Sequence, residues 1–212
     1  MTTPHHEMRI DAVIGELDRA EARCILDLGC GDGDLLLRLA GLSRIQRIVG
    51  VDLSAAALDR LRRRTLTPAK SFAADIHLVC GSMMGPLGSL GEIDAAVLLE
   101  SIEHINPHEL SKLEHELFRN VRPKLVVMTT PNADYNPVLG VPSHRYRHPD
   151  HRFEWGRERF RTWSSGVARR GGYEVRHADI VGAHPRLGGS SQMAVFELRD
   201  RSPVSSFPNA AA

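Results

Sequence analysis

Short buried strands alternate with helices along this chain, and this alternation limits the possible folds more than any other feature of the sequence. Apolar runs predict strands at residues 24–28, 45–52, 76–80, 94–99, 125–129, 173–175 and 193–198. Helical spacing of apolar residues occurs at 8–17, from 35 onward, and at 54–64, 106–119 and 155–169. Strands separated by helices form βαβ units, which build a sheet with helices on its faces. We therefore predict a Rossmann-like α/β fold around a mostly parallel seven-stranded sheet.

A single domain accounts for the 212 residues, and we expect it to span residues 7–200. Residues 1–6 are predicted to be a disordered N-terminus and residues 201–212 a flexible C-terminal tail. No apolar run has the length of a membrane span, and no targeting leader opens the chain. The three cysteines lack zinc-type spacing and are interpreted as reduced thiols, so we expect a cytoplasmic protein without a membrane partner.

The charge of the chain is balanced, with 27 basic and 26 acidic residues and a net charge of +1. Such a chain has no global positive field that would attract nucleic acid, so contact with RNA requires a local patch. The basic run Arg60-Leu-Arg-Arg-Arg64 lies on a predicted helix, and a solvated helix face is favoured there over an RNA patch.

A glycine-rich acidic turn follows the first predicted strand, with the sequence Asp27-Leu-Gly-Cys-Gly-Asp-Gly. Glycine allows a tight turn and a close approach of the backbone to a ligand. Asp27, Asp32 and Asp34 would repel a pyrophosphate, whereas a cationic ligand suits them. Asp52 ends the second strand, the position at which an acidic side chain accepts hydrogen bonds from ribose hydroxyls.

A glycine-rich turn alone is common to nucleotide-binding sheets, but the acidic turn together with Asp52 favours S-adenosylmethionine. Strand three ends at Gly81-Ser82, where the adenine edge is expected. The fold class is therefore predicted to be that of the class I S-adenosylmethionine-dependent methyltransferases. The expected cofactor-binding residues are Asp27, Gly29, Gly31, Asp52, Leu53 and Ser82.

Two carboxylates and an imidazole follow the fourth strand, at Glu100, Glu103 and His104. Spacings of i, i+3 and i+4 place three side chains on one face of a helical turn. A fourth ligand is available from His144, His148 or His151, and the spacing alone admits any of the three. Oxygen and imidazole ligands suit Mn²⁺, Mg²⁺, Fe²⁺ or Co²⁺. The alternative is a solvated helix start, which the position after the fourth strand makes less favoured.

These motifs together resemble the 3′-terminal RNA ribose 2′-O-methyltransferases, the family named for the plant small-RNA methylase HUA enhancer, and most closely its bacterial branch. The resemblance spans about residues 8–198. The stretches that carry it are Asp27-Leu-Gly-Cys-Gly-Asp-Gly, Gly50-Val-Asp-Leu-Ser, Glu100-Ser-Ile-Glu-His-Ile, Thr129-Thr-Pro-Asn-Ala-Asp-Tyr-Asn, Arg147-His-Pro-Asp-His-Arg-Phe-Glu-Trp and Gln192-Met-Ala-Val-Phe.

The resemblance implies a catalytic, metal-binding set at Glu100, Glu103, His104 and His151, with Mn²⁺ favoured. It implies cofactor contacts at Gly29, Asp52 and Ser82. The implied reaction moves a methyl group from S-adenosylmethionine to the 2′-OH of the last nucleotide of an RNA with a free 2′,3′-diol, which the ion would chelate. Because bacterial members join this domain to an N-terminal half from an RNA-repair system, the resemblance also implies such a half or a repair partner. A DNA partner is not expected.

The segment from Asn132 to Arg152 is predicted to be a long loop over the site, rich in His, Arg, Asn and Tyr. Loops of this length in a compact domain are usually functional. We expect it to clamp the terminal nucleotide through Asn132, Arg147 and His148. The alternative function is a metal-dependent small-molecule O-methyltransferase, although such enzymes usually build the metal site from Asp and Asn.

Overall fold

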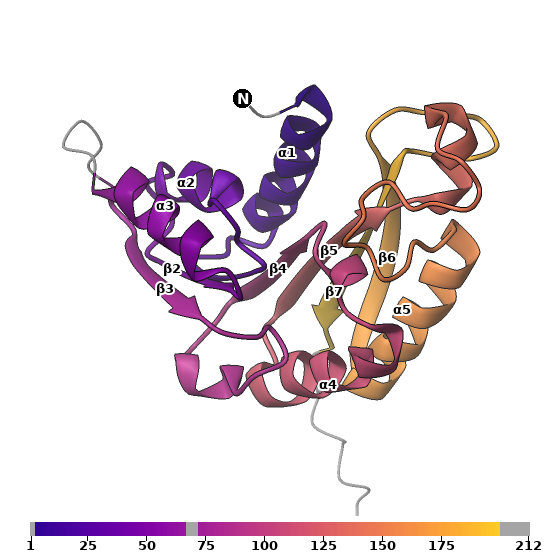
Figure 1. The fold of residues 1–212 in the computed structure, drawn as a ribbon. Coiled ribbons are helices and arrows are strands. Elements are labelled where there is room, and N and C mark those ends of the chain that lie inside the picture. The colour runs from indigo at the N-terminus through magenta and orange to yellow at the C-terminus, as the bar shows by residue number, and fades with distance from the viewer. Residues whose placement is uncertain (1–2, 67–71, 200–212) are drawn as a thin grey trace, which may run out of the picture.

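The computed structural model describes residues 3–66 and 72–199, which form one seven-stranded sheet with the order β3-β2-β1-β4-β5-β7-β6 (Figure 1). The strands are β1 Cys24–Leu28, β2 Arg47–Asp52, β3 Asp75–Cys80, β4 Ala95–Leu99, β5 Leu125–Pro131, β6 Tyr173–Ile180 and β7 Ser191–Leu198. The first five strands of this order are parallel, and β7 runs antiparallel to both of its neighbours. The predicted mostly parallel seven-stranded sheet is confirmed.

Helices cover both faces of the sheet (Figure 1). One face packs against α1 Pro4–Arg19, α2 Asp34–Ala40 and α3 Ala55–Thr65, whose apolar side chains share a core cluster with Ile25, Ile48 and Val97. The other face packs against α4 Leu110–His115 and α5 Arg157–Gly171. Successive side chains of a strand point to opposite faces, which is why Leu26 belongs to this second cluster. No helix among the described residues is both long and apolar enough to cross a membrane.

The first helix begins nearer to the N-terminus than we predicted from the sequence. Helix α1 begins at Pro4, so residues 4–6, expected to be disordered, are helical. The Thr3 hydroxyl accepts a hydrogen bond from the amide of His6, and proline is favoured in the first turn because its missing N–H has no helical partner there. The predicted tail at 201–212 lies outside the described residues.

The helix predicted at 106–119 is broken into three pieces. A 3₁₀ turn at Pro107–Glu109 precedes α4, and a π-helix at Glu116–Val121 follows it. The Glu116 carboxylate accepts hydrogen bonds from the amide of Gly88, at 2.9 Å, and from the side chain of Asn120. These bonds anchor the widened turns to the chain between β3 and β4, a contact that local spacing does not encode.

Parallel strands bring the points at which they end to one edge of the sheet. The carboxyl ends of β1, β2, β4 and β5 are followed by Gly29, Leu53, Glu100 and Asn132. Strand β7 runs the other way, so its first residue, Ser191, pairs with Pro131 at the same edge. Ligands of open α/β sheets bind outside this edge.

Candidate active site

The glycine turn after β1 adopts backbone conformations that favour glycine, with φ values of +80° at Gly29, +51° at Gly31 and +81° at Gly33. At Gly29, a Cβ atom would lie 2.8 Å from the Cβ of Ser101. A side chain there would therefore collide with the segment after β4. The turn keeps the backbone open to a ligand at the edge of the sheet.

The acidic residues of this turn fall into two groups. Asp32 pairs with Arg60 at 2.8 Å and Asp34 with Arg64 at 3.1 Å, so helix α3 neutralises both. Asp27 is buried, and its Oδ2 has no hydrogen-bond partner. Burial and the nearby charge of Asp52 raise the pKa of Asp27 to about 7.

We expected all three aspartates to attract a cationic ligand. Because Asp32 and Asp34 are paired with arginines, Asp27 is the one of the three that keeps this predicted role. Three arginines of the basic run on α3 form ion pairs: Arg60 and Arg64 with the turn acids Asp32 and Asp34, and Arg62 with Asp59 of the same helix.

The Asp52 carboxylate, at the end of β2, is hydrogen-bonded to the glycine turn. It accepts hydrogen bonds from the amides of Gly31 and Ser54, each at 2.8 Å. Each oxygen keeps an acceptor position free, because a carboxylate offers about four lone-pair sites. Asp52 can thus stabilise the turn and still accept hydrogen bonds from a ligand's hydroxyl groups.

Two pockets meet at Gly29. One, of about 270 Å³, is lined by Asp52, Leu53, Gly81, Glu100, Ser101 and His104, together with Gly29, Val51 and Met83. The other, of about 220 Å³, is lined by residues of the glycine turn, including Asp27 and Gly31. Ser82 follows Gly81 but is not in this lining, and its hydroxyl accepts a hydrogen bond from the amide of Met84. The first pocket joins the predicted cofactor residues to the predicted metal residues.

A carboxylate and two imidazoles converge beside this pocket. The ligand atoms of Glu103, His104 and His151 all lie within 4.8 Å of one another. Glu103 is completely buried; its Oε2 accepts a hydrogen bond from Thr130 at 3.0 Å, while its Oε1 has no partner. Burial and the neighbouring charge of Glu100 raise the pKa of Glu103 well above its usual value. A buried carboxylate with an unpaired oxygen is costly unless a cation completes it.

Glu100 lies beside this trio but outside it. Its φ of +48° is uncommon for a residue with a side chain, and Ile102–His104 form a 3₁₀ turn, so the predicted α-helical turn is not present. The Oε2 of Glu100 contacts Arg9 Nε at 3.2 Å and accepts a hydrogen bond from Ser191. Its Oε1 is buried and has no hydrogen-bond partner. One oxygen of Glu100 is thus held by protein and the other is free for a ligand.

His151 is the loop histidine that reaches the trio. Its Nδ1 lies 2.6 Å from Glu154 Oε1, which leaves Nε2 to face an ion. Desolvation and the nearby His151 lower the pKa of His104, which favours the neutral imidazole that binds metals. His148 is exposed, with its ring centroid 6.0 Å from that of His104. Among the described residues, neither His148 nor His144 belongs to the group of converging ligand atoms.

The loop residues expected to hold substrate are placed differently from one another. Asn132 is buried, and its amide nitrogen donates to the carbonyls of Leu187 and Gly189. Arg147 donates to Asn136 Oδ1 at 2.6 Å and to the carbonyls of Asn132 and Ser190. These two side chains thus brace the segment through hydrogen bonds to protein groups, and their contact with a substrate stays a prediction. His148 alone of the three is exposed beside the trio.

Comparison with known proteins identifies the family. Residues 25–124 match the family described as methyltransferase domain. A small RNA 2′-O-methyltransferase of Xenopus tropicalis is 33% identical over 204 residues, which cover 91% of this chain and 54% of that protein. The solved methyltransferase domain of bacterial CtHen1 is 32% identical, with a TM-score of 0.78. The match covers 92% of this chain and 100% of that domain. The chain belongs to the Hen1 family of methyltransferases.

The fold is accordingly that of the class I S-adenosylmethionine-dependent methyltransferases. The small RNA methyltransferase HEN1, also solved, has a TM-score of 0.84 and 28% identity over 94% of this chain and 26% of its own. This Hen1-family chain spans about half the length of the curated animal relatives it matches.

Four residues that contact the candidate site residues were not predicted from the sequence: Arg9, Thr130, Glu154 and Ser191. Glu154 lies in one of the stretches that carry the family resemblance, four residues after Asp150, so a signal existed for it. Arg9 lies on α1, 91 positions before Glu100, and nothing in its local sequence marks it.

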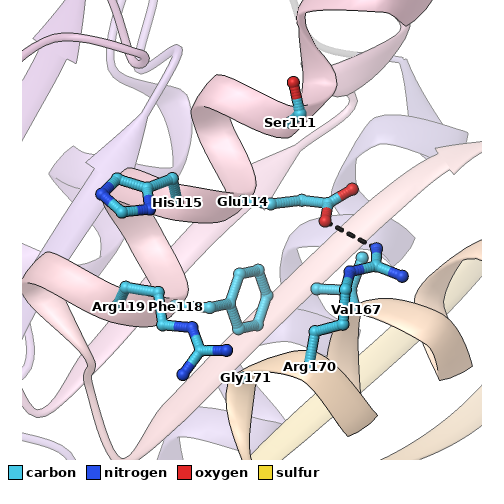
Figure 2. Close-up of a pocket in the computed structure, with 8 residues that line it drawn as sticks. All are labelled: Ser111, Glu114, His115, Phe118, Arg119, Val167, Arg170 and Gly171. Carbon is cyan, nitrogen blue, oxygen red and sulfur yellow. Dashed lines mark hydrogen bonds and ion pairs between the residues drawn. The ribbon is translucent and has the colours of Figure 1, made fainter.

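Another pocket of the Hen1-type domain, of about 180 Å³, lies between α4, the π-helix and α5 (Figure 2). Within it, Arg170 donates to the Glu114 carboxylate at 2.6 Å, the contact drawn as a dashed line. Its lining residues are Ser111, Glu114, His115, Phe118, Arg119, Val167, Arg170 and Gly171. None of them lines the pockets at Gly29, so this hollow is separate from the candidate site.

Proposed function

We propose that this protein transfers a methyl group from S-adenosylmethionine to the 2′-OH of the 3′-terminal nucleotide of RNA. The observation that carries the proposal is the pocket in which Gly29 and Asp52 lie together with Glu100 and His104. A methyl donor at the glycine turn is thereby adjacent to a cluster suited to a metal ion. The names of the curated relatives, small RNA 2′-O-methyltransferases, support RNA as the acceptor.

The donor fits the charges of the cleft. Asp27 is the acidic residue of the turn without a basic partner among the described residues, and it suits the amino group of the donor. Asp52 has free acceptor positions for ribose hydroxyls. Leu53 is 72% exposed and offers an apolar surface beside the same pocket.

The chemistry of the donor set fits a divalent cation such as Mn²⁺, Mg²⁺, Co²⁺ or Fe²⁺. The family resemblance favours Mn²⁺ among them. Glu103, His104 and His151 would hold it, and the unpartnered Oε1 of Glu100 supplies a fourth oxygen. When bound, such an ion lowers the pKa of a hydroxyl group that meets it. Arg9 holds the other oxygen of Glu100 and keeps that carboxylate at the edge of the pocket.

The acceptor proposed is an RNA end with a free 2′,3′-diol. A chain of this family also occurs in a Pnkp1/Rnl/Hen1 RNA repair complex, and we propose an RNA-repair partner or N-terminal half for this protein too. The three free cysteines support a reducing compartment such as the cytoplasm. The alternative, a small-molecule O-methyltransferase, is less favoured because two imidazoles stand at the cluster.

A methyl-transfer assay with tritiated donor tests the proposal. RNA, DNA of the same sequence and a catechol are compared with and without added Mn²⁺. We expect label in RNA only, abolished by EDTA and restored by Mn²⁺. Label in the catechol but not in RNA would support the alternative, and full RNA methylation in a metal-free preparation would exclude the proposed ion.

A further inference from the structure

Glu154 lies at the centre of a hydrogen-bond hub behind the histidine ligand. Its side chain is 1% exposed and that of His151 8% exposed. Its Oε1 accepts hydrogen bonds from His151 Nδ1 at 2.6 Å and from the amide of Arg147 at 2.7 Å. Its Oε2 accepts from Asn136 Nδ2 at 2.7 Å. One buried carboxylate thus joins the candidate metal ligand to two points of the segment 132–152, called the 132–152 loop here, in which Ala133–Leu139 form a 3₁₀ helix.

The hydrogen bonds of Glu154 decide which nitrogen of His151 is available. Its Oε1 also accepts from the amide of Arg147 and its Oε2 accepts from Asn136 Nδ2, so both oxygens act as acceptors. The proton of a neutral His151 must therefore lie on Nδ1, and the lone pair of Nε2 is left for a ligand. A carboxylate on the far nitrogen also raises the basicity of the imidazole.

On the loop side of the hub, Asn136 and Arg147 are also held by hydrogen bonds to protein groups. Asn136 donates to Glu154 while its Oδ1 accepts from Arg147 Nε at 2.6 Å, so the amide of Asn136 cannot be turned over without losing both bonds. Arg147 in turn donates to the carbonyl of Ser190 at 2.7 Å, next to the residue that contacts Glu100. The loop is tied to both ends of the metal cluster through these contacts.

We propose that Glu154 is a positioning residue that couples metal binding to the order of the 132–152 loop, because the same carboxylate directs His151 Nε2 toward the ion and holds Asn136 and Arg147. The inference rests on the proposed function, since it takes the Glu and His cluster to be a metal site. It adds that binding of the ion orders the loop next to the acceptor, and that an ordered loop raises the affinity for the ion. Such coupling is reciprocal: the free energy by which the ion stabilises the loop equals that by which the ordered loop stabilises the bound ion.

The first test measures the affinity of the protein for Mn²⁺ by electron paramagnetic resonance, with no donor or RNA present. Glu154→Gln removes the charge behind His151, and we expect the affinity to fall 10–100-fold, as for other residues behind metal ligands. Glu158→Gln is the matched control, because Glu158 is an exposed glutamate at the start of α5 and should bind Mn²⁺ like the unsubstituted protein. Thermal unfolding of each variant checks that it is folded.

The double variant Glu154→Gln/Asn136→Asp separates charge from scaffolding. In it, the glutamine amide can donate to the new aspartate, which also accepts from Arg147 Nε, so the loop bonds and the net charge are retained. The partner of His151 is nevertheless neutral. We expect hydrogen exchange of the 132–152 loop to return toward that of the unsubstituted protein, while Mn²⁺ affinity stays low.

Hydrogen exchange with and without Mn²⁺ tests the coupling itself. In the unsubstituted protein, Mn²⁺ should slow exchange across the loop, including the Arg147 amide, and in Glu154→Gln this effect should be lost. Unchanged Mn²⁺ affinity in a folded Glu154→Gln protein, or a loop indifferent to Mn²⁺ in the unsubstituted one, would overturn the inference alone. Failure of the unsubstituted protein to bind Mn²⁺ would instead contradict the proposed metal site.

Discussion

Asp27 has a pKa far above that of an aspartate in solution. Its carboxyl is buried beneath the glycine turn, and its pKa of about 7 means that half of the ligand-free molecules carry a proton there near neutral pH. A cationic ligand prefers the ionised form. Donor binding should therefore be linked to release of this proton.

The affinity for S-adenosylhomocysteine should accordingly rise with pH through about 7. Below that value the group is neutral and attracts the ligand's amino group less, whereas above it the carboxylate is already formed. Calorimetry between about pH 6 and 8, in buffers of different ionisation enthalpy, would show proton release on the acid side. Asp27→Asn should bind weakly with little pH dependence. An affinity that is flat with pH in the unsubstituted protein would remove Asp27 from the donor site.

Glu103 is the residue that most favours the proposed metal site, because it is completely buried with one unpaired oxygen. Glu103→Ala should reduce methyl transfer at least about a hundredfold, since losses behind the ligands alone cost 10–100-fold. In the unsubstituted protein, Mn²⁺ at about 100 times its Kd should add about 2.7 kcal/mol to the free energy of unfolding. Calorimetric melting should show this gain and its loss in Glu103→Ala. Equal stabilisation of both proteins would place the ion elsewhere.

At the scale of elements, helix α1 closes the site from the N-terminal side. Its Arg9 contacts Glu100 and Ser191 at one end. Near its other end, the nearly buried Glu16 accepts hydrogen bonds from Arg176 of β6, one of them 3.0 Å long, and pairs with Arg19. Burial raises the pKa of Glu16, but the bonds from Arg176 and Arg19 outweigh it, so the pKa is lowered.

Glu16→Gln should weaken this attachment by about 1.5–3 kcal/mol at neutral pH, the range for hydrogen bonds to charged groups. Because the folded-state pKa is depressed, the contribution is present above the ordinary pKa of 4.5 and is lost as pH falls through the folded value. Chemical denaturation should thus separate the variant from the unsubstituted protein at pH 7 and much less at about pH 3. An equal difference at both pH values would assign the effect to packing.

Helices and strands were predictable where the spacing of apolar residues and the residue types in the turns agree. They were not predictable where contacts between distant segments determine the local structure. Buried apolar runs marked all seven strands, and the glycines after β1 marked the turn. The start of α1 was missed, although Thr3 and Pro4 form a recognisable cap. The π-helix depends on Glu116 reaching Gly88. Asn132 and Arg147 each donate to a carbonyl more than 40 positions away, at Leu187 and Ser190. Local sequence carries no signal for such contacts.

At the scale of the whole molecule, one sheet edge unites the methyl-donor cleft with the Glu and His cluster. Strand order alone brings Gly29, Asp52 and Glu100 together from segments far apart in the chain. The sequence predicted this convergence because parallel strands end at a common edge. It did not predict that one oxygen of Glu100 contacts Arg9 and Ser191, or that Glu100 lies beside the three converging ligand atoms and not among them.

The position of the transferred methyl group on the RNA distinguishes methylation of the 3′-terminal 2′-OH from methylation at any other atom. An RNA oligonucleotide with a 2′,3′-diol end is incubated with labelled donor and Mn²⁺, digested to nucleosides and analysed by mass spectrometry. We expect a single 2′-O-methylated nucleoside, derived from the last position, and a product that resists periodate oxidation because its vicinal diol is blocked. Methylation at internal riboses or on a base, or efficient methylation of an RNA with a 3′-deoxy end, would contradict it.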